Sequence, residues 1–117
     1  MTLRSFVLAI SCFALLAGGP ATAANQRTYQ GQEAAALRCA NMLALTAVSL
    51  AGVKLISQQD KDIMLGVTVL ILERHVSGSW AQKKAALKIM QSRRSLPDTL
   101  DDYQQNAAKC LRQFPIN

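Results

Sequence analysis

The chain has few of the side chains that carry out catalysis or bind metals. Its 117 residues include one His, three Cys and seven Asp or Glu, and 5% of them are aromatic. It contains no CxxC pair and no glycine-rich phosphate loop. These absences argue against His-based metal clusters, thioredoxin-like redox motifs and nucleotide-binding loops. We therefore predict no enzymatic activity, no metal and no cofactor.

Hydrophobic residues, by contrast, are abundant. They make up half of the chain, and Ala and Leu account for much of that half. Such a composition favours helices over a sandwich or barrel and excludes intrinsic disorder. A chain of this length forms one domain, because domains usually have about 100–150 residues. We predict an all-α fold, a small four-helix bundle.

Residues 1–23 have the three parts of a cleaved secretory signal peptide. Arg4 is the positive n-region, residues 5–17 are uncharged and mostly apolar, and 21–23 are small residues before a cleavage site at Ala23 or Ala24. The apolar run is too short to span a bilayer, which disfavours an uncleaved anchor. Lipid attachment at Cys12 is disfavoured because the usual Leu three residues earlier is missing. The signal is compact and no Asn-x-Ser/Thr sequon occurs, so we predict secretion to a bacterial periplasm.

The predicted mature chain, residues 24–117, is a single helical domain with two cysteines. It keeps 12 of the 13 basic residues and all seven acids, so its net charge is +5. Cys39 and Cys110 form an even pair in an oxidising compartment, which indicates a disulfide. The alternative, a redox-active pair, is weaker because neither thiol has the His neighbour or CxxC spacing that lowers a thiol pKa.

Periodicity and capping signals predict helices at about 32–56, 58–76, 80–94 and 97–113. The first has an apolar stripe formed by Cys39, Met42, Leu43, Thr46, Leu50 and Val53. It is a core helix rather than a membrane span, because its longest uncharged run is below the roughly 20 residues needed. The second is apolar on nearly every face and should be surrounded by other helices. Residues 67–72 also have strand propensity, but they have no strand to pair with.

The third predicted helix has the clearest functional signal, a basic face. Between residues 76 and 97 there is no acid, and the positive side chains are Lys83, Lys84, Lys88, Arg93 and Arg94. Secretion and the scarcity of aromatic residues argue against nucleic acid as the ligand. An acidic envelope protein fits better, and anionic lipid or surface polysaccharide is the alternative. A third interpretation is a solvated face with no partner. Trp80 is either an interface anchor or a plug between two helices.

His75 and the aspartates provide the only other candidates for chemistry. If His75 served a hydrolase, it would need an orienting partner and a nucleophile beside it. A simpler explanation is that a positive side chain at the end of a helix is favoured by the helix dipole. Asp98, Asp101 and Asp102 could form a glycosidase pair, but acids in a first helical turn complement the helix dipole.

The overall layout is similar to those of two groups of small secreted proteins. A signal peptide, about 90 mature residues, helices throughout and one disulfide between Cys39 and Cys110 resemble the periplasmic acid-stress chaperones and the immunity proteins of secreted amidases. The likeness lies in the architecture and this cysteine pair and assigns no family. From the lack of catalytic motifs, the disulfide-tied scaffold and the basic third helix, we predict a non-catalytic protein that binds another envelope protein as an inhibitor, a chaperone or an accessory subunit. Its oligomeric state is left open.

Overall fold

The computed structural model describes residues 26–117, so the predicted signal peptide lies outside the described part. Four helices follow one another: α2 (Gly31–Gly52), α3 (Gln58–His75), α4 (Trp80–Arg93) and α5 (Leu96–Gln113). No strand occurs between residues 26 and 117, and the segment 67–72 is part of α3. The predicted all-α fold is therefore confirmed.

Local capping sets where three of the helices begin. Ser57 starts α3 with a reciprocal capping box to Asp60, and Ser79 starts α4 with the same arrangement to Gln82. Ser95 accepts a hydrogen bond from the backbone N–H of Asp98 at the start of α5. Each cap satisfies backbone donors that have no partner inside the helix. The three helices begin within one residue of the predicted starts.

The end of α2 differs from its prediction. We expected this helix to continue to about residue 56, but it ends at Gly52. Lys54 has a left-handed backbone with φ 62°, its N–H bonds the carbonyl of Ala51, and the N–H of Leu55 bonds the carbonyl of Leu50. These are the two hydrogen bonds of a Schellman motif, here formed with Lys in the position that Gly usually takes.

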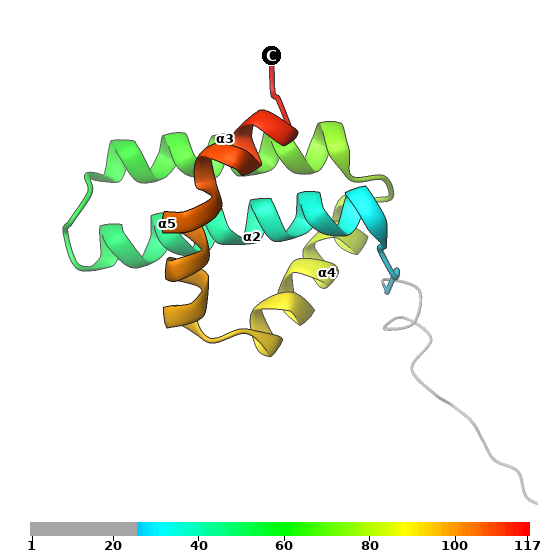
Figure 1. Cartoon of the computed structure of the whole chain (residues 1–117), viewed down its shortest axis with the longest axis horizontal. Helices are drawn as coiled ribbons and strands as arrows, with labels where there is room; N and C mark the ends of the chain where they lie inside the picture. The colour runs from blue at the N-terminus through cyan, green and yellow to red at the C-terminus, as the bar shows by residue number, and fades with distance from the viewer. Residues whose placement is uncertain (1–25) are drawn as a thin grey trace, which may run out of the picture.

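Helix α2 is the centre of the fold (Figure 1). It runs antiparallel to α3, while α5 crosses both helices and α4 lies on the side of α2 away from α3. The core includes Leu37, Met42, Leu43, Ile71, Leu72, Val76 and Phe114. By length and composition α2 could cross a membrane, yet 56% of its most apolar window is buried inside the fold. That burial agrees with a core helix.

Helix α5 is fixed to α2 by the predicted disulfide. Cys39 and Cys110 are bonded, with their Cα atoms 5.6 Å apart. Both cysteines are buried. The bond confirms the predicted pairing of Cys39 with Cys110.

Helix α3 is less covered than its composition predicted. Only Thr68, Ile71 and Leu72 are buried along it, whereas Ile63 is 58% exposed and Val69 is 42% exposed. The expectation that α3 is surrounded by helices is wrong, because α4 and α5 pack mainly on α2 and leave the outer side of α3 uncovered.

Candidate functional site

The five basic residues predicted for the third helix, four in α4 and Arg94 at its C-cap, do not share one face. Lys84 and Lys88 are exposed and border a shallow hollow with Leu87 and Gln91. Lys83 is 8% exposed, so its stem packs against the body of the protein. Successive residues of a helix point about 100° apart, and this rotation separates Lys83 from Lys84.

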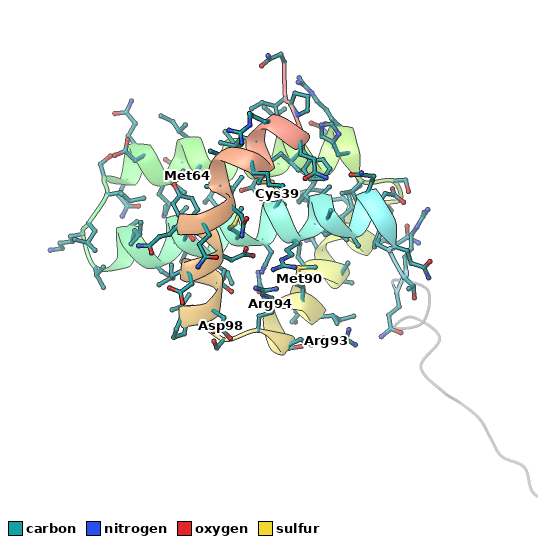
Figure 2. All side chains as sticks on the ribbon, viewed as in Figure 1. Cys39, Met64, Met90, Arg93, Arg94 and Asp98 are labelled. Carbon is teal, nitrogen blue, oxygen red and sulfur yellow. A yellow bond between two sulfur atoms is a disulfide. The ribbon has the colours of Figure 1, made fainter. Side chains whose placement is uncertain are left out.

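Figure 2 shows the two arginines at the end of α4, Arg93 and Arg94. Both line a groove. Arg93 is exposed, and Arg94 is half-buried and forms an ion pair with Asp102. Trp80, at the start of the same helix, is 46% exposed and is not a core plug. The structure thus divides the predicted basic surface into an outer part at Lys84 and Lys88 and a groove part at Arg93 and Arg94.

The groove runs between the N-terminal segment, α2 and α4, and its volume is about 370 Å³. Ala34 and Leu37 contribute from α2, and Ala86, Ile89 and Met90 from α4. The α4 residues face the groove together because they are spaced three and four apart. Its remaining lining residues are Arg27, Thr28, Tyr29, Arg93 and Arg94. The groove therefore has an apolar floor, three guanidinium groups and no acidic lining residue.

The turn between α3 and α4 holds the N-terminal wall of this groove in place. The Arg27 guanidinium donates to Ser77 Oγ at 2.8 Å, and the Tyr29 hydroxyl donates to the Ser77 carbonyl at 2.7 Å. The Ser77 backbone N–H donates to Glu33 Oε2 at 2.6 Å. Hydrogen bonds from Ser77 lower the pKa of Glu33, whereas burial raises the pKa of Tyr29.

Gly78 makes this turn possible. Its φ of 97° disfavours other residues, and an added Cβ would lie 2.6 Å from Gln82 Oε1 and 2.8 Å from the Tyr29 hydroxyl oxygen. The sequence gives no sign that residues 26–30 have a role, so the contribution of Arg27 and Tyr29 was not predicted. The only local signal was Gly78, which was expected to end the preceding helix.

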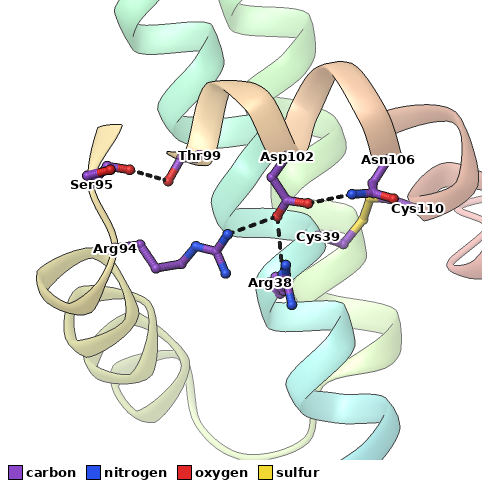
Figure 3. A network of polar contacts seen from close by, with 8 residues as sticks. All are labelled: Arg38, Cys39, Arg94, Ser95, Thr99, Asp102, Asn106 and Cys110. Atoms are coloured by element: carbon purple, nitrogen blue, oxygen red, sulfur yellow. Dashed lines mark hydrogen bonds and ion pairs between the residues drawn. A yellow bond between two sulfur atoms is a disulfide. The ribbon is translucent and has the colours of Figure 1, made fainter. Parts of the chain in front are cut away.

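The other polar cluster lies where α2, α4 and α5 meet (Figure 3). Asp102 Oδ2 accepts from Arg38 Nε at 3.1 Å and from an Arg94 guanidinium nitrogen at 3.5 Å. Asp102 Oδ1 accepts from Asn106 Nδ2 at 2.6 Å. Asp102 is only 8% exposed. Burial alone raises its pKa, but the hydrogen bonds from Asn106 and Arg38 and the two positive charges outweigh burial and keep the pKa below its usual range.

This cluster changes the interpretation of the aspartates. Asp98 lies in the first turn of α5, as the helix-dipole explanation requires. Asp102 instead joins α2, α4 and α5, a role that was not predicted from the sequence. A pocket of about 230 Å³ lies alongside, lined by residues that include Arg38, Met42, Asp102 and Phe114. Because Asp102 already accepts from three donors, it is suited to positioning these helices rather than to acting as a base.

His75 packs at the C-terminal end of the chain. Its Nε2 lies 2.7 Å from the carbonyl oxygen of Pro115, and its ring meets that of Phe114 edge-on at 5.4 Å. It does not line any of the three pockets described between residues 26 and 117. In the same part of the chain, no group of three His, Cys, Asp or Glu side chains is placed to hold a metal. Among the described residues, the hydrogen-bond partner of the His75 ring is a backbone carbonyl and not a carboxylate or hydroxyl group.

No family model matches the chain, and no curated protein or solved structure is significantly similar to it. A functional assignment therefore rests on the groove and its charges.

Proposed function

We propose that this is a non-catalytic, secreted protein that binds an acidic segment of another envelope protein in the groove beside α4. The observation that carries the proposal is the combination of an apolar floor with Arg27, Arg93 and Arg94 and no acidic lining residue. An inhibitor, a chaperone and an accessory subunit would each use such a surface. The envelope location rests on the predicted signal peptide, and the disulfide is compatible with it.

The apolar floor of the groove would bind an apolar side chain of the partner, and the arginines would bind its carboxylates. Ile89 and Met90 offer apolar surface, and the unbranched Met side chain adapts to partners of different shape. A guanidinium binds a carboxylate through two parallel hydrogen bonds. The preferred segment therefore has an apolar side chain with Asp or Glu residues on either side of it.

Arg93 is the best placed of the three arginines to accept a partner. Arg94 is already paired with Asp102, and Arg27 is bonded to Ser77. Arg93 is exposed and is in no ion pair between residues 26 and 117. Lys84 and Lys88 lie elsewhere on α4 and add long-range attraction rather than contacts inside the groove.

The first experiment captures the partner. The oxidised mature protein is immobilised and exposed to its own envelope extract at 0.1 M and 1 M salt. Over this range the Debye length falls from about 10 Å to about 3 Å, so contacts between charged surfaces should weaken. Recovery of one stoichiometric, acidic protein at low salt supports the proposal. Recovery of anionic lipid or polysaccharide without a protein supports the alternative, and recovery of nothing contradicts both.

A pair of charge reversals then tests the groove itself. Arg93→Glu changes a groove residue, and Lys88→Glu makes the same charge change on the outer part of α4. We expect Arg93→Glu to raise the dissociation constant of the captured protein about tenfold or more, mainly through faster release. Lys88→Glu should mainly slow association at low salt. Equal effects of the two variants would show that the contact is unspecific attraction, not binding in the groove.

A further inference from the structure

The single tryptophan of the chain lies outside the core. Trp80 begins α4, it is 46% exposed, and it is not among the side chains of residues 26–117 that pack against the core. Tryptophan is highly buried on average in folded proteins, because its ring is large and mostly apolar. The groove does not include Trp80 either. The described chain therefore leaves a large apolar ring in contact with water.

Two lysines follow Trp80 along the same side of α4. Lys84 and Lys88 come four and eight residues after it, and residues four apart on a helix lie one above the other. Both lysines are exposed, and neither is in an ion pair between residues 26 and 117. Helix α4 contains no Asp or Glu. Trp80, Lys84 and Lys88 thus form an outer stripe about 12 Å long, with an aromatic ring at one end and two positive charges beyond it.

The surface beside the outer stripe is open. Lys84 and Lys88 border a shallow hollow together with Ala85, Leu87 and Gln91, so every residue that lines this hollow comes from α4. The groove, by contrast, has lining residues from the N-terminal segment, α2 and α4. A surface formed by one helix does not enclose a peptide segment, but it can lie flat against an extended surface.

The chemistry of the outer stripe matches a phospholipid bilayer with anionic head groups. Trp is enriched where membranes meet water, because its ring is apolar while its N–H still forms a hydrogen bond. Lys keeps its ammonium group among the anionic head groups while its alkyl stem contacts apolar surface. An acidic protein or polysaccharide also supplies negative charge, whereas a bilayer supplies a continuous apolar layer directly below that charge.

We propose that the outer stripe attaches this protein to the surface of an anionic bilayer, with Trp80 inserted among the head groups and Lys84 and Lys88 paired with them. No residue lines both the hollow and the groove, so the protein can be attached to a membrane while its groove binds a partner. One aromatic ring and two lysines give weak, reversible binding rather than permanent anchoring. The inference does not rest on the proposed partner, because it concerns only the protein and lipid.

Vesicles of defined composition test the attachment. The oxidised mature protein is mixed with vesicles of phosphatidylcholine alone or with vesicles that also contain phosphatidylglycerol. Because Trp80 is the only tryptophan, its fluorescence reports directly on the outer stripe. We expect its emission to move to shorter wavelength with the anionic vesicles only, and the effect to weaken at 1 M salt, where the Debye length is about 3 Å. Emission that changes with neither kind of vesicle overturns the proposal.

Two charge-reversed proteins test where the contact lies. Lys84→Glu combined with Lys88→Glu should weaken binding to the anionic vesicles about 25-fold or more, because each lysine near such a surface contributes about fivefold. Lys54→Glu combined with Lys109→Glu makes the same change of net charge at exposed positions of the α2–α3 turn and of α5. This control should weaken binding about twofold at most, because screening limits the effect of distant charges. Equal losses would show attraction by net charge alone and overturn the proposal.

A second pair of variants tests the tryptophan. Trp80→Ala should weaken binding in vesicle sedimentation about tenfold or more, because the exposed part of the ring no longer leaves water. Leu96→Ala is the control at matching exposure, 45% against 46%, and should leave binding unchanged. Both side chains are exposed, so both variants should unfold close to the native temperature. If the protein binds a soluble anionic polysaccharide as tightly as the vesicles, and Trp80→Ala weakens neither, the outer stripe is not a bilayer contact and the proposal is overturned.

Discussion

The two sides of α2 are held together by different kinds of interaction. On one side α3 packs through apolar side chains, and the described residues of α2 and α3 form no ion pair, side-chain hydrogen bond or disulfide with one another. Where α5 crosses α2, the two helices are joined by a disulfide and by the buried carboxylate of Asp102. The stability of the contact between α2 and α3 therefore depends on buried apolar area. The stability of the contact between α2 and α5 depends on a few specific links. Changes of redox state or pH should act mainly on the second.

The largest effect is expected from removing the disulfide. Changing both Cys39 and Cys110 to Ser should lower the free energy of unfolding by about 4 kcal/mol, because the bond closes a loop with a sequence separation of 71. Urea unfolding of the variant and of the reduced native protein gives two independent measurements. Amides of α5 should lose hydrogen-exchange protection before those of α2 and α3. A loss below about 1 kcal/mol in both samples would contradict this expectation.

The apolar side should respond to the loss of a single buried side chain. Ile71 is fully buried, so Ile71→Ala should cost about 3 kcal/mol through lost burial and the cavity that remains. Val69→Ala on the exposed side of the same helix is the control and should cost less than about 1 kcal/mol. Thermal unfolding of the native protein and both variants makes the measurement. Similar costs for the two variants would mean that α3 packs by a different face.

The ionic side should show the clearest pH dependence. Asp102→Asn should cost about 2 kcal/mol at pH 7, because Arg38 and Arg94 lose a charged acceptor. Since the fold lowers the pKa of Asp102, this stabilisation is complete above the unfolded pKa of about 4 and is lost as the pH falls through the folded pKa. The gap between native protein and variant should therefore narrow below about pH 4.

The control for this change is Asp98→Asn in the first turn of α5. It should cost only about 0.3–1 kcal/mol, the usual size of an exposed helix-dipole interaction. Urea unfolding of all three proteins at several pH values makes the measurement. If the Asp102→Asn gap stayed constant from pH 7 to pH 2, the carboxylate would not be the source of the stabilisation.

The smallest effect concerns the turn that leads from the apolar side to the ionic side. Gly78→Ala should cost about 1–2 kcal/mol, because its positive φ is unfavourable for a residue with a Cβ. The new Cβ would also displace Gln82 and Tyr29. Gly52→Ala provides the contrast, since its Cβ would meet nothing within 4 Å. This substitution should slightly raise the free energy of unfolding, because Ala favours the helix more than Gly. Equal stability of the two variants would show that the turn is not constrained.

The sequence was sufficient for features that depend on neighbouring residues. Ser57, Ser79 and Ser95 mark helix starts because a cap is formed within four residues. The disulfide was predicted from the number of cysteines, because only Cys39 and Cys110 lie outside the predicted signal peptide. The end of α2 was missed because Lys54 adopts a conformation that composition does not predict.

Features that depend on docking could not be predicted in this way. Arg27 and Tyr29 reach the groove only because Ser77 holds them, 50 and 48 residues away in the sequence. The outer side of α3 is exposed because α4 and α5 pack on α2. The periodicity of α3 cannot predict where these two helices pack. In the sequence, Asp102 could be explained as an acid that complements the dipole of its helix. Only the fold shows that Arg38 and Arg94 lie beside it.

The position of the disulfide also determines what a protease can do to this molecule. Every turn between the helices lies between Cys39 and Cys110, including the exposed turn at 53–57. A single cut in any of these turns would leave both fragments covalently joined through α2 and α5. A nicked protein would therefore run as one species on a non-reducing gel and as two after reduction. In a protease-rich environment, a single cut of the backbone would therefore not separate the two parts of the molecule.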